Sequence, residues 1–304
     1  MGTPDFAVPA LRALAAGPHR VLAVVTQPDR PKGRGRKLTP PPVKTLALDL
    51  GYPVIQPQNY ADPVFAEAVR RYAPDWFIVI AHGHILKKVH LALPRLGALN
   101  VHASLLPRHR GPAPIQWSII NGDTETGVTT MLMDEGLDSG DMLLTARTAI
   151  TPDDTAASLH DRLAVMGADL LMETLAGLAA DRIKPVSQEH AAATYAPMLT
   201  KADGQIQWSR PGHKIDALIR GLTPWPGAYT FYQGKRLKIF KVCPSTTTHP
   251  AAPGTILPGF QDELRVATGD GALSIVEIQG QGGRRMPAAD FLKGHPIPPG
   301  ARLE

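Results

Sequence analysis

Short apolar segments alternate with amphipathic segments along the first two-thirds of the chain. The apolar segments are partly β-branched, which is typical of buried strands, and they cover residues 21–26, 76–81, 98–101 and 128–133. Helical patterns lie before and between them, at residues 7–16, 42–50, 63–71 and 114–120. This alternation predicts an α/β fold with a doubly wound, mostly parallel sheet, in which ligands bind outside the carboxyl ends of the strands.

The pattern changes after residue 150. Apolar positions recurring on one face predict a long helix from about Asp154 to Leu178, and residues 181–200 then show prolines and polar residues without periodicity. Short strand-like segments follow, bounded by Gly, Pro or Asp, at residues 236–242, 254–256, 264–268 and 272–278. We therefore expect a first domain at 1–180, a linker at 181–204 and a small β-domain at 205–304.

Composition agrees with a two-domain globular protein of 304 residues, 43% of them hydrophobic. The single cysteine, Cys243, excludes an intramolecular disulfide and a cysteine-rich zinc site. No apolar run approaches the roughly 18 residues of a membrane span, and the N-terminus lacks a signal-peptide pattern. We expect a cytoplasmic, monomeric protein with no membrane partner.

The net charge of +5 comes from the C-terminal part of the chain. Residues 205–304 contain 12 Lys and Arg against 7 Asp and Glu, whereas the rest is balanced at 20 each. Such an excess is usually a solvated surface, but it is also what a phosphate-backbone partner requires.

Three polar residues form the main candidate for chemistry. Asn100 and His102 are two positions apart at the end of a predicted strand, so their side chains are expected on the same side. Asp138 lies between Gly136 and Gly140, in a turn-rich segment suited to presenting a carboxylate. An amide donor, an imidazole and a carboxylate can stabilise an oxyanion and move protons off an amine without a serine or cysteine nucleophile.

This set, together with the Ser-Leu-Leu-Pro at residues 104–107, resembles the signature of the tetrahydrofolate-dependent formyltransferases. Within that family, the chain is similar to the tRNA-dependent members at residues 2–7, 26–31, 33–35, 42–44, 111–116, 122–127, 194–196 and 225–226. The resemblance implies a Rossmann-like formyltransferase domain followed by a small OB-like β-barrel.

The same resemblance implies transfer of the formyl group from 10-formyltetrahydrofolate, a co-substrate, to the amino group of methionyl-initiator tRNA. Asn100 and protonated His102 would donate to the oxyanion, and Asp138 would support the imidazolium and help remove the amine proton. The folate pocket would be lined by Ser104, Leu105, Leu106, Pro107, Ile80, His82 and Gly83. No metal is expected, because His82 and His84 have no third ligand at a suitable spacing.

The segment from Pro28 to Lys44 is basic and rich in proline. It holds five prolines, two glycines and six Lys or Arg against one Asp, so we expect it to stay out of regular structure. It could be a solvated loop or a finger for nucleic acid, and the resemblance implies the second, with Arg34 as the key contact. The residues expected to bind tRNA are Arg30, Lys32, Arg34, Arg36 and Lys37, and Arg236 and Lys238 on an expected strand of the β-domain.

Two other functions stay open from the residues. One is a folate-dependent formyltransferase acting on a small amine such as an amino-sugar nucleotide, and the other is a noncatalytic tRNA-binding relative. The resemblance also places Met1–Asp5 in the turn that follows the first strand of family members. We therefore expect the sheet to lack its leading strand.

Overall fold

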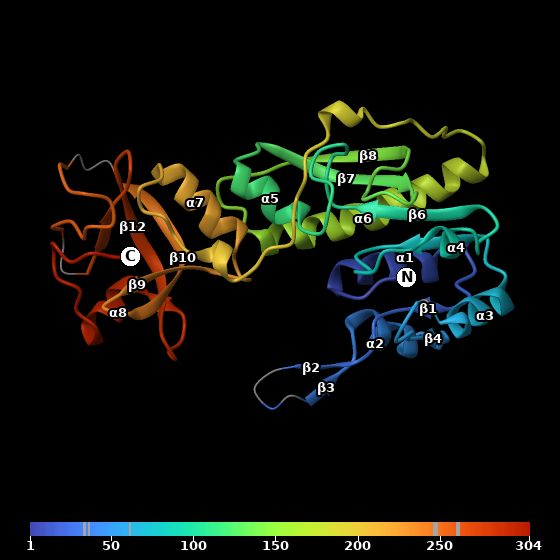
Figure 1. Cartoon of the computed structure of the whole chain (residues 1–304), viewed down its shortest axis with the longest axis horizontal. Helices are drawn as coiled ribbons and strands as arrows, with labels where there is room; N and C mark the ends of the chain where they lie inside the picture. The colour runs from blue at the N-terminus through green and yellow to red at the C-terminus, as the bar shows by residue number, and fades with distance from the viewer. Residues whose placement is uncertain (33–34, 36, 61, 246–248, 260–261) are drawn as a thin grey trace. The chain divides into compact units, whose positions relative to one another are not determined.

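The computed structural model describes residues 1–304 except 33, 34, 36, 61, 246–248 and 260–261 (Figure 1). It divides into two compact units. The first consists of Met1–Pro114, Glu125–Ala149 and His160–Pro197, and the second of Ile115–Thr124, Ile150–Leu159 and Met198–Glu304. The first unit contains all three residues of the candidate chemistry.

A four-stranded mixed sheet carries the first unit. Its order is β5 (Trp76–Val79), β6 (Gly97–His102), β7 (Glu125–Leu132) and β8 (Met142–Ala149). β5 and β6 are parallel, whereas β7 and β8 are antiparallel to their neighbours, and β1 (Val24–Val25) and β4 (Val54–Ile55) form a separate parallel pair. The α/β class is confirmed, and the parallel order is confined to β1–β4 and β5–β6. β8 escaped prediction because its exposed residues alternate with half-buried ones and include Thr and Arg.

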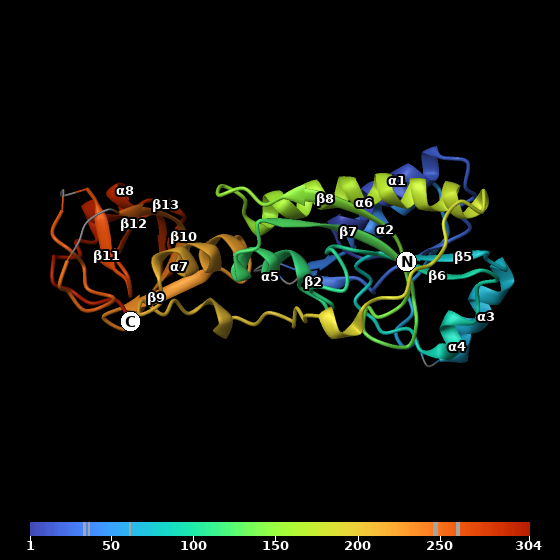
Figure 2. The same ribbon diagram turned by 90° about the horizontal axis from the view of Figure 1, so that it is seen from above.

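Helices cover the sheet of the first unit on both faces. On one face lie α1 (Val8–Ala16), α2 (Pro42–Asp49), the short η1 (Asp5–Ala7) and α6 (Ala156–Ala179), as Figure 2 shows for α1 and α6. Gly167 of α6 approaches Val101 of β6, and the Thr174 hydroxyl hydrogen-bonds that of Thr130 on β7 at 2.8 Å. On the other face, α3 (Pro63–Tyr72) packs in one core with β5, near α4 (Lys88–Leu91). The helices predicted at 7–16, 42–50, 63–71, 114–120 and 154–178 are confirmed within a few residues.

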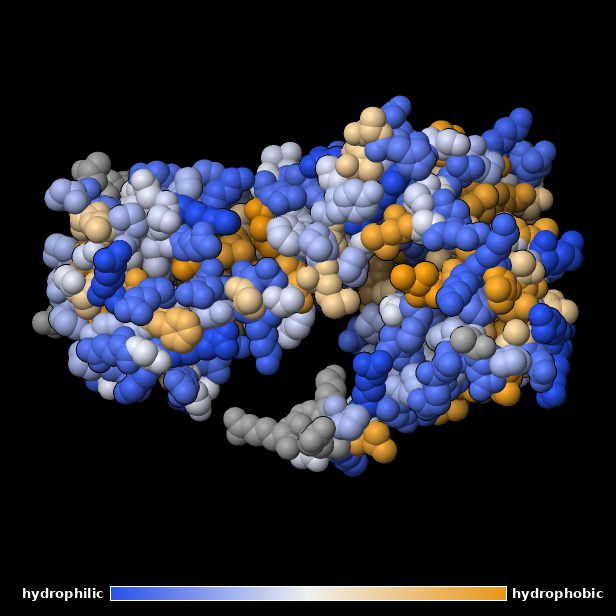
Figure 3. Space-filling model, in the orientation of Figure 1, coloured by the Kyte–Doolittle hydropathy of each residue, from blue (hydrophilic) through white to orange (hydrophobic). Residues whose placement is uncertain are grey.

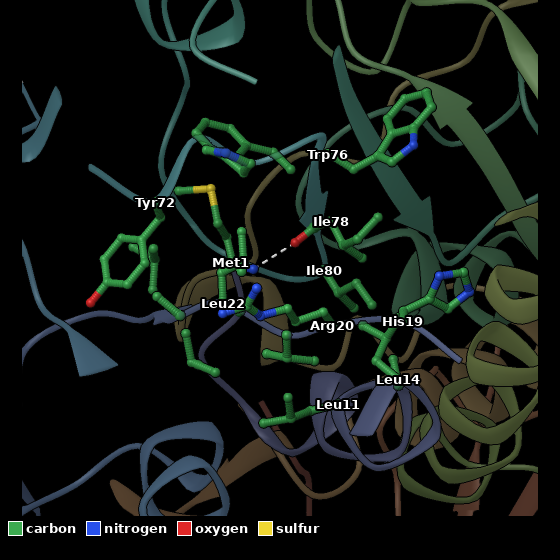
Figure 4. Close-up of a pocket in the computed structure, with 18 of the residues that line it drawn as sticks. Met1, Leu11, Leu14, His19, Arg20, Leu22, Tyr72, Trp76, Ile78 and Ile80 are labelled. Carbon is green, nitrogen blue, oxygen red and sulfur yellow. Dashed lines mark hydrogen bonds between the residues drawn. The ribbon is translucent and has the colours of Figure 1, made fainter. Parts of the chain in front are cut away.

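Met1 and Gly2 form backbone hydrogen bonds with the end of β1 and with the residue that follows β5. The Gly2 N–H donates to Val25 O at 3.0 Å, and on the other side the Ile80 N–H donates to Met1 O at 2.9 Å. A cavity of about 470 Å³ is lined by Met1, residues 21–25 and most of β5, among others (Figure 4). Apolar surface gathers on this unit in Figure 3. Residues 21–23 line this cavity, and β1 is shorter than the predicted 21–26.

The expectation that the basic segment lacks regular structure is wrong. β2 (Arg30–Lys32) and β3 (Lys37–Thr39) pair as antiparallel strands, with Pro31 opposite Leu38. Proline is compatible with this ladder because both strands of an isolated pair are edge strands, where an N–H can be missing. At the base, Lys44 Nζ lies 2.8 Å from Asp29 Oδ1. Arg34 and Arg36 lie outside the described residues.

The second unit is built on an antiparallel sheet. Its strands are β9 (Ala228–Tyr232), β10 (Lys235–Ser245), β11 (Leu264–Ala267), β12 (Ala272–Gly280) and β13 (Met286–Pro287), in the order β11-β12-β10-β9 with β13 on β12. α7 (Gly212–Gly221) and α8 (Ala288–Gly294) contribute to its core, and α5 (Pro114–Asn121) also falls largely in this unit. The small β-domain is confirmed. The strand predicted at 254–256 is wrong, since residues there make only isolated bridges, to Arg302 and Val266.

Residues 181–204 are more ordered than a simple linker. They include η2 (His190–Ala192) and η3 (Ala202–Gly204), and bridges join Val186 to Met142 and Tyr195 to Arg110. Residues up to Pro197 group with the first unit. Among the described residues, no helix has the length and apolar character needed to cross a membrane.

Candidate active site

Asn100, His102 and Asp138 meet at one end of β6. Asn100 and His102 are both buried, and they occupy alternate positions of β6, as the strand pattern predicted. Asp138 comes from the connection between β7 and β8. Asn100 Nδ2 lies 3.4 Å from Asp138 Oδ1, and His102 Nδ1 lies 3.7 Å from Asp138 Oδ2. The structure therefore brings an amide, an imidazole and a carboxylate together.

The two nitrogens of His102 have different surroundings. Nε2 lies 2.9 Å from the carbonyl oxygen of His109, and a carbonyl can only accept, so Nε2 carries a proton. Nδ1 therefore is the ring nitrogen that faces Asp138. The His109 N–H in turn donates to Thr194 Oγ1 at 2.8 Å, which fixes the backbone that holds the imidazole.

Asp138 is held in a conformation that most residues avoid. Its φ is +50°, in the left-handed region that Asp and Asn tolerate best among residues with a side chain. Its Oδ2 accepts the Gly111 N–H at 2.8 Å. Gly111 has a φ of +116°, and a Cβ there would meet Ala196 O at 2.8 Å, so only glycine can present this N–H without displacing the chain.

The segment predicted to line the folate pocket follows directly after β6. Ser104 is fully buried, and its hydroxyl donates to Arg108 O at 2.6 Å. The Leu106 N–H donates to Thr129 Oγ1, and Thr129 Oγ1 donates to Ser104 O at 2.7 Å. Leu105 and Pro107 are only partly buried. In this structure the Ser104 hydroxyl stabilises the turn, whereas Leu105 and Pro107 keep part of their surface exposed.

The second predicted folate segment is fixed by a buried tyrosine. Tyr60 Oη lies 2.5 Å from His82 Nε2, while His82 O accepts from Gln27 Nε2 at 3.0 Å. Burial lowers the pKa of His82 to about 3, so its imidazole is neutral. Gly83 has a φ of +76°, whereas the neighbouring Ile80 is buried and lines the cavity of Figure 4. Asn100, His102 and Asp138 are not among the residues that line that cavity.

The described residues among those predicted to bind tRNA belong to the β2–β3 pair of the first unit and to β10 of the second. Arg30 and Lys37 are exposed at the two ends of the β2–β3 pair, and the Lys32 backbone belongs to β2. On β10 the alternation is as predicted, with Leu237 and Ile239 buried and their neighbours Arg236 and Lys238 half-buried. The Arg236 guanidinium lies 3.5 Å from the centre of the Tyr229 ring, so its face is already stacked.

Several residues that support the site were not predicted from residue type or spacing. His109 and Gly111 act through backbone groups, and Thr194 comes from the segment interpreted as a linker. Gly111 and Thr194 lie inside segments that resemble the formyltransferases, which is the only signal that could have pointed to them. Among the described residues, no group of three or more His, Cys, Asp or Glu side chains could hold a metal ion.

Comparison with known families defines the class of this protein. Residues 1–175 match the family described as formyl transferase, and residues 198–296 match the formyl transferase C-terminal domain. The chain belongs to the formyltransferase family.

Relatives that match over the whole chain share one name. The methionyl-tRNA formyltransferase of Citrifermentans bemidjiense is 52% identical over 303 residues, covering 100% of this chain and 95% of the relative. The methionyl-tRNA formyltransferase of Desulfotalea psychrophila is 52% identical over 297 residues, covering 98% and 92%.

Solved structures show the same fold at low identity. WlaRD, a sugar 3N-formyl transferase crystallised with dTDP and 5-N-formyl-THF, is 17% identical with a TM-score of 0.68, over 93% of this chain and 97% of that one. HypX from Aquifex aeolicus in complex with tetrahydrofolic acid is 19% identical with a TM-score of 0.61, over 89% of this chain and 47% of that one.

Proposed function

We propose that this protein transfers the formyl group of 10-formyltetrahydrofolate to the amino group of methionyl-initiator tRNA, for translation initiation. The observation that carries the proposal is the convergence of Asn100, His102 and Asp138 in a chain that is 52% identical to a methionyl-tRNA formyltransferase over its full length. The similar solved structures that contain tetrahydrofolic acid or 5-N-formyl-THF support a folate donor.

The geometry suggests a division of roles. The amine of methionine attacks the formyl carbon, and the Asn100 amide donates to the oxyanion that forms. The tetrahedral intermediate then collapses, the bond from the formyl carbon to N10 of the folate breaks, and tetrahydrofolate leaves with a proton in place of the formyl group. Since His102 Nε2 is taken by His109 O, the proton that His102 offers to the reacting atoms comes from Nδ1. Asp138 faces Nδ1 at 3.7 Å, supports the imidazolium and accepts the amine proton directly or through water. No covalent enzyme intermediate is needed.

Donor binding falls to the segments around residues 80–83 and 104–107. The partly exposed Leu105 and Pro107 offer apolar contact, and the turn that contains His82 and Gly83 covers the pterin. His82 is neutral, buried and hydrogen-bonded to Tyr60, so it holds the backbone of this segment in place.

Contacts with tRNA fall to the basic residues. Arg30 and Lys37 are exposed on the β2–β3 pair, and Lys32, Arg34 and Arg36 complete the set from the sequence. Guanidinium and ammonium groups on this segment neutralise phosphates, and Arg also recognises base edges through its planar fork. On β10, Lys238 contacts the phosphate backbone of the tRNA. Arg236 contributes the N–H groups at the edge of its guanidinium, because one face is stacked on Tyr229.

A formylation assay tests the proposal. Purified protein is incubated with 10-formyltetrahydrofolate and methionyl-initiator tRNA, and formyl-methionine is measured after deacylation. Parallel reactions contain an amino-sugar nucleotide or methionyl-elongator tRNA as acceptor. We expect turnover with methionyl-initiator tRNA and none with the other two acceptors. Turnover only with the small amine identifies the sugar-type reaction, and tRNA binding without any turnover identifies a noncatalytic relative.

A further inference from the structure

A series of buried hydrogen bonds links the segment at residues 181–204 to the backbone of Asp138. Gln188 and Arg110 are both 4% exposed. Arg110 donates from Nε and Nη2 to Gln188 Oε1, at 3.0 and 2.6 Å. Gln188 Nε2 donates to the carbonyl oxygens of Asp138 and Gly140, at 2.9 and 2.7 Å. The Gln188 side-chain amide therefore joins the buried Arg110 guanidinium to two backbone carbonyls of the loop that contains Asp138.

The orientation of this amide is determined by its partners. A guanidinium has only donors, so it must face the oxygen, and two carbonyls have only acceptors, so they must face the nitrogen. A flipped Gln188 would lose all four bonds. A buried guanidinium needs acceptors for its N–H groups, and Gln188 Oε1 accepts two of them, so Arg110 also keeps Gln188 in place.

The same series of hydrogen bonds also controls the partner of the Asp138 carboxylate. Arg110 precedes Gly111, whose N–H donates to Asp138 Oδ2 at 2.8 Å. The Arg110 N–H donates to Thr194 O at 2.8 Å, and the Ala196 N–H donates to Arg110 O at 2.7 Å. Gln188 thus holds the Asp138 backbone from one side while Arg110 places the N–H that orients the carboxylate from the other.

We propose that Gln188, held by Arg110, is a positioning residue that keeps Asp138 in its left-handed conformation and aims its carboxylate at Asn100 and His102. This inference rests on the proposed formyl transfer for its kinetic part. Gln188 donates only to backbone carbonyls, so it acts through Asp138. The segment at 181–204 is then part of the active-site scaffold.

The decisive variant is Gln188→Glu. A carboxylate of the same size keeps the Arg110 contact but cannot donate to Asp138 O and Gly140 O. We expect kcat to fall about 10- to 100-fold, as for a displaced catalytic group, with KM for methionyl-tRNA and for the folate unchanged. Thr174→Val is the control, because it removes another buried hydroxyl bond of the first unit, to Thr130, and should leave kcat unchanged.

Two further measurements separate positioning from general destabilisation. Turnover of Gln188→Glu is compared in the wild-type and the Asp138→Asn backgrounds, and the effect should nearly vanish in the second. Amide hydrogen exchange of Gly111 reports the bond to Asp138 without any substrate, and its protection should fall in Gln188→Glu but not in Thr174→Val.

The outcomes are distinct. An unchanged kcat, an equal loss in the Asp138→Asn background, or unchanged Gly111 protection in Gln188→Glu each overturns the positioning role. A wild-type protein without formylation activity refutes the proposed function instead, and Gly111 exchange then still decides whether Gln188 holds Asp138.

Discussion

Replacing Asp138 by Asn separates the charge of this side chain from its shape. Asn is the residue closest to Asp in its tolerance of the left-handed region, so the φ of +50° adds no new strain. The Asn oxygen can still accept the Gly111 N–H, now bonded at 2.8 Å. What is lost is the negative charge that faces His102 Nδ1 at 3.7 Å and that is proposed to accept a proton in the reaction. The acceptor of the Asn100 amide is lost as well, because the Asn nitrogen takes the place of Oδ1.

The expected loss follows from this role. General-base and electrostatic contributions of a positioned side chain are about 10²- to 10⁴-fold in rate, and we expect kcat of Asp138→Asn to fall in that range. Tenfold in rate is about 1.4 kcal/mol, so the activation free energy rises by about 3–5.5 kcal/mol. The free energy of unfolding should fall less, by about 1–2 kcal/mol, because the hydrogen bond from the Gly111 N–H becomes neutral and the 3.4 Å contact of Asn100 loses its acceptor.

The assay is single-turnover formylation of methionyl-initiator tRNA, with thermal unfolding measured on the same samples. Asp141→Asn is the matched control. It lies three positions further along the same connection, and its carboxylate accepts a hydrogen bond from the hydroxyl of the exposed Ser187, at 2.9 Å. Asp141→Asn should keep wild-type kcat. A rate loss below tenfold in Asp138→Asn, or an equal loss in Asp141→Asn, would refute the role given to the Asp138 charge.

Three other substitutions test separate parts of the argument. Gly111→Ala should lose about 1–3 kcal/mol of unfolding free energy and most activity, because its Cβ meets Ala196 O; Gly51→Ala, with a φ of +75° and open space, should keep activity in the same formylation assay. Since the folded-state pKa of His82 is about 3, the unfolded state binds the extra proton between pH 6.5 and 3, and stability falls as pH falls, by up to about 1.4 kcal/mol per pH unit. His82→Gln should flatten that slope in urea titrations, whereas the exposed His295→Gln should not. Arg34→Ala should raise KM for tRNA and leave folate binding in calorimetry unchanged, with Arg34→Lys intermediate.

The strand and helix periods were strong enough to predict the α/β class. Buried β-branched segments such as β5 and the long apolar face of α6 depend on local composition, which a sequence displays directly. β8 and the β2–β3 pair were missed because their residues are polar or proline-rich, and they are strands only through pairing with a neighbour. Pairing also explains the false strand at 254–256. Its residues suit a strand, but its partners form only isolated bridges.

The candidate site shows a similar division. The strand period was sufficient to place Asn100 and His102 on one side of β6, because alternate residues point the same way. The contribution of His109 could not be read, because it acts through a carbonyl group that every residue carries. Position in the chain, and not residue type, decides whether such a group serves a site.

Residues 181–204 show why domain boundaries and functional boundaries need not coincide. Low periodicity and prolines predict a connection between domains, whereas residues up to Pro197 group with the first unit. A connection that must cross the end of a sheet also supplies backbone and side-chain groups at the place where α/β ligands bind. Here it delivers Gln188 to the carbonyl of Asp138 and Thr194 to the N–H of His109. Substitutions in this segment are therefore expected to affect turnover as well as the connection between domains.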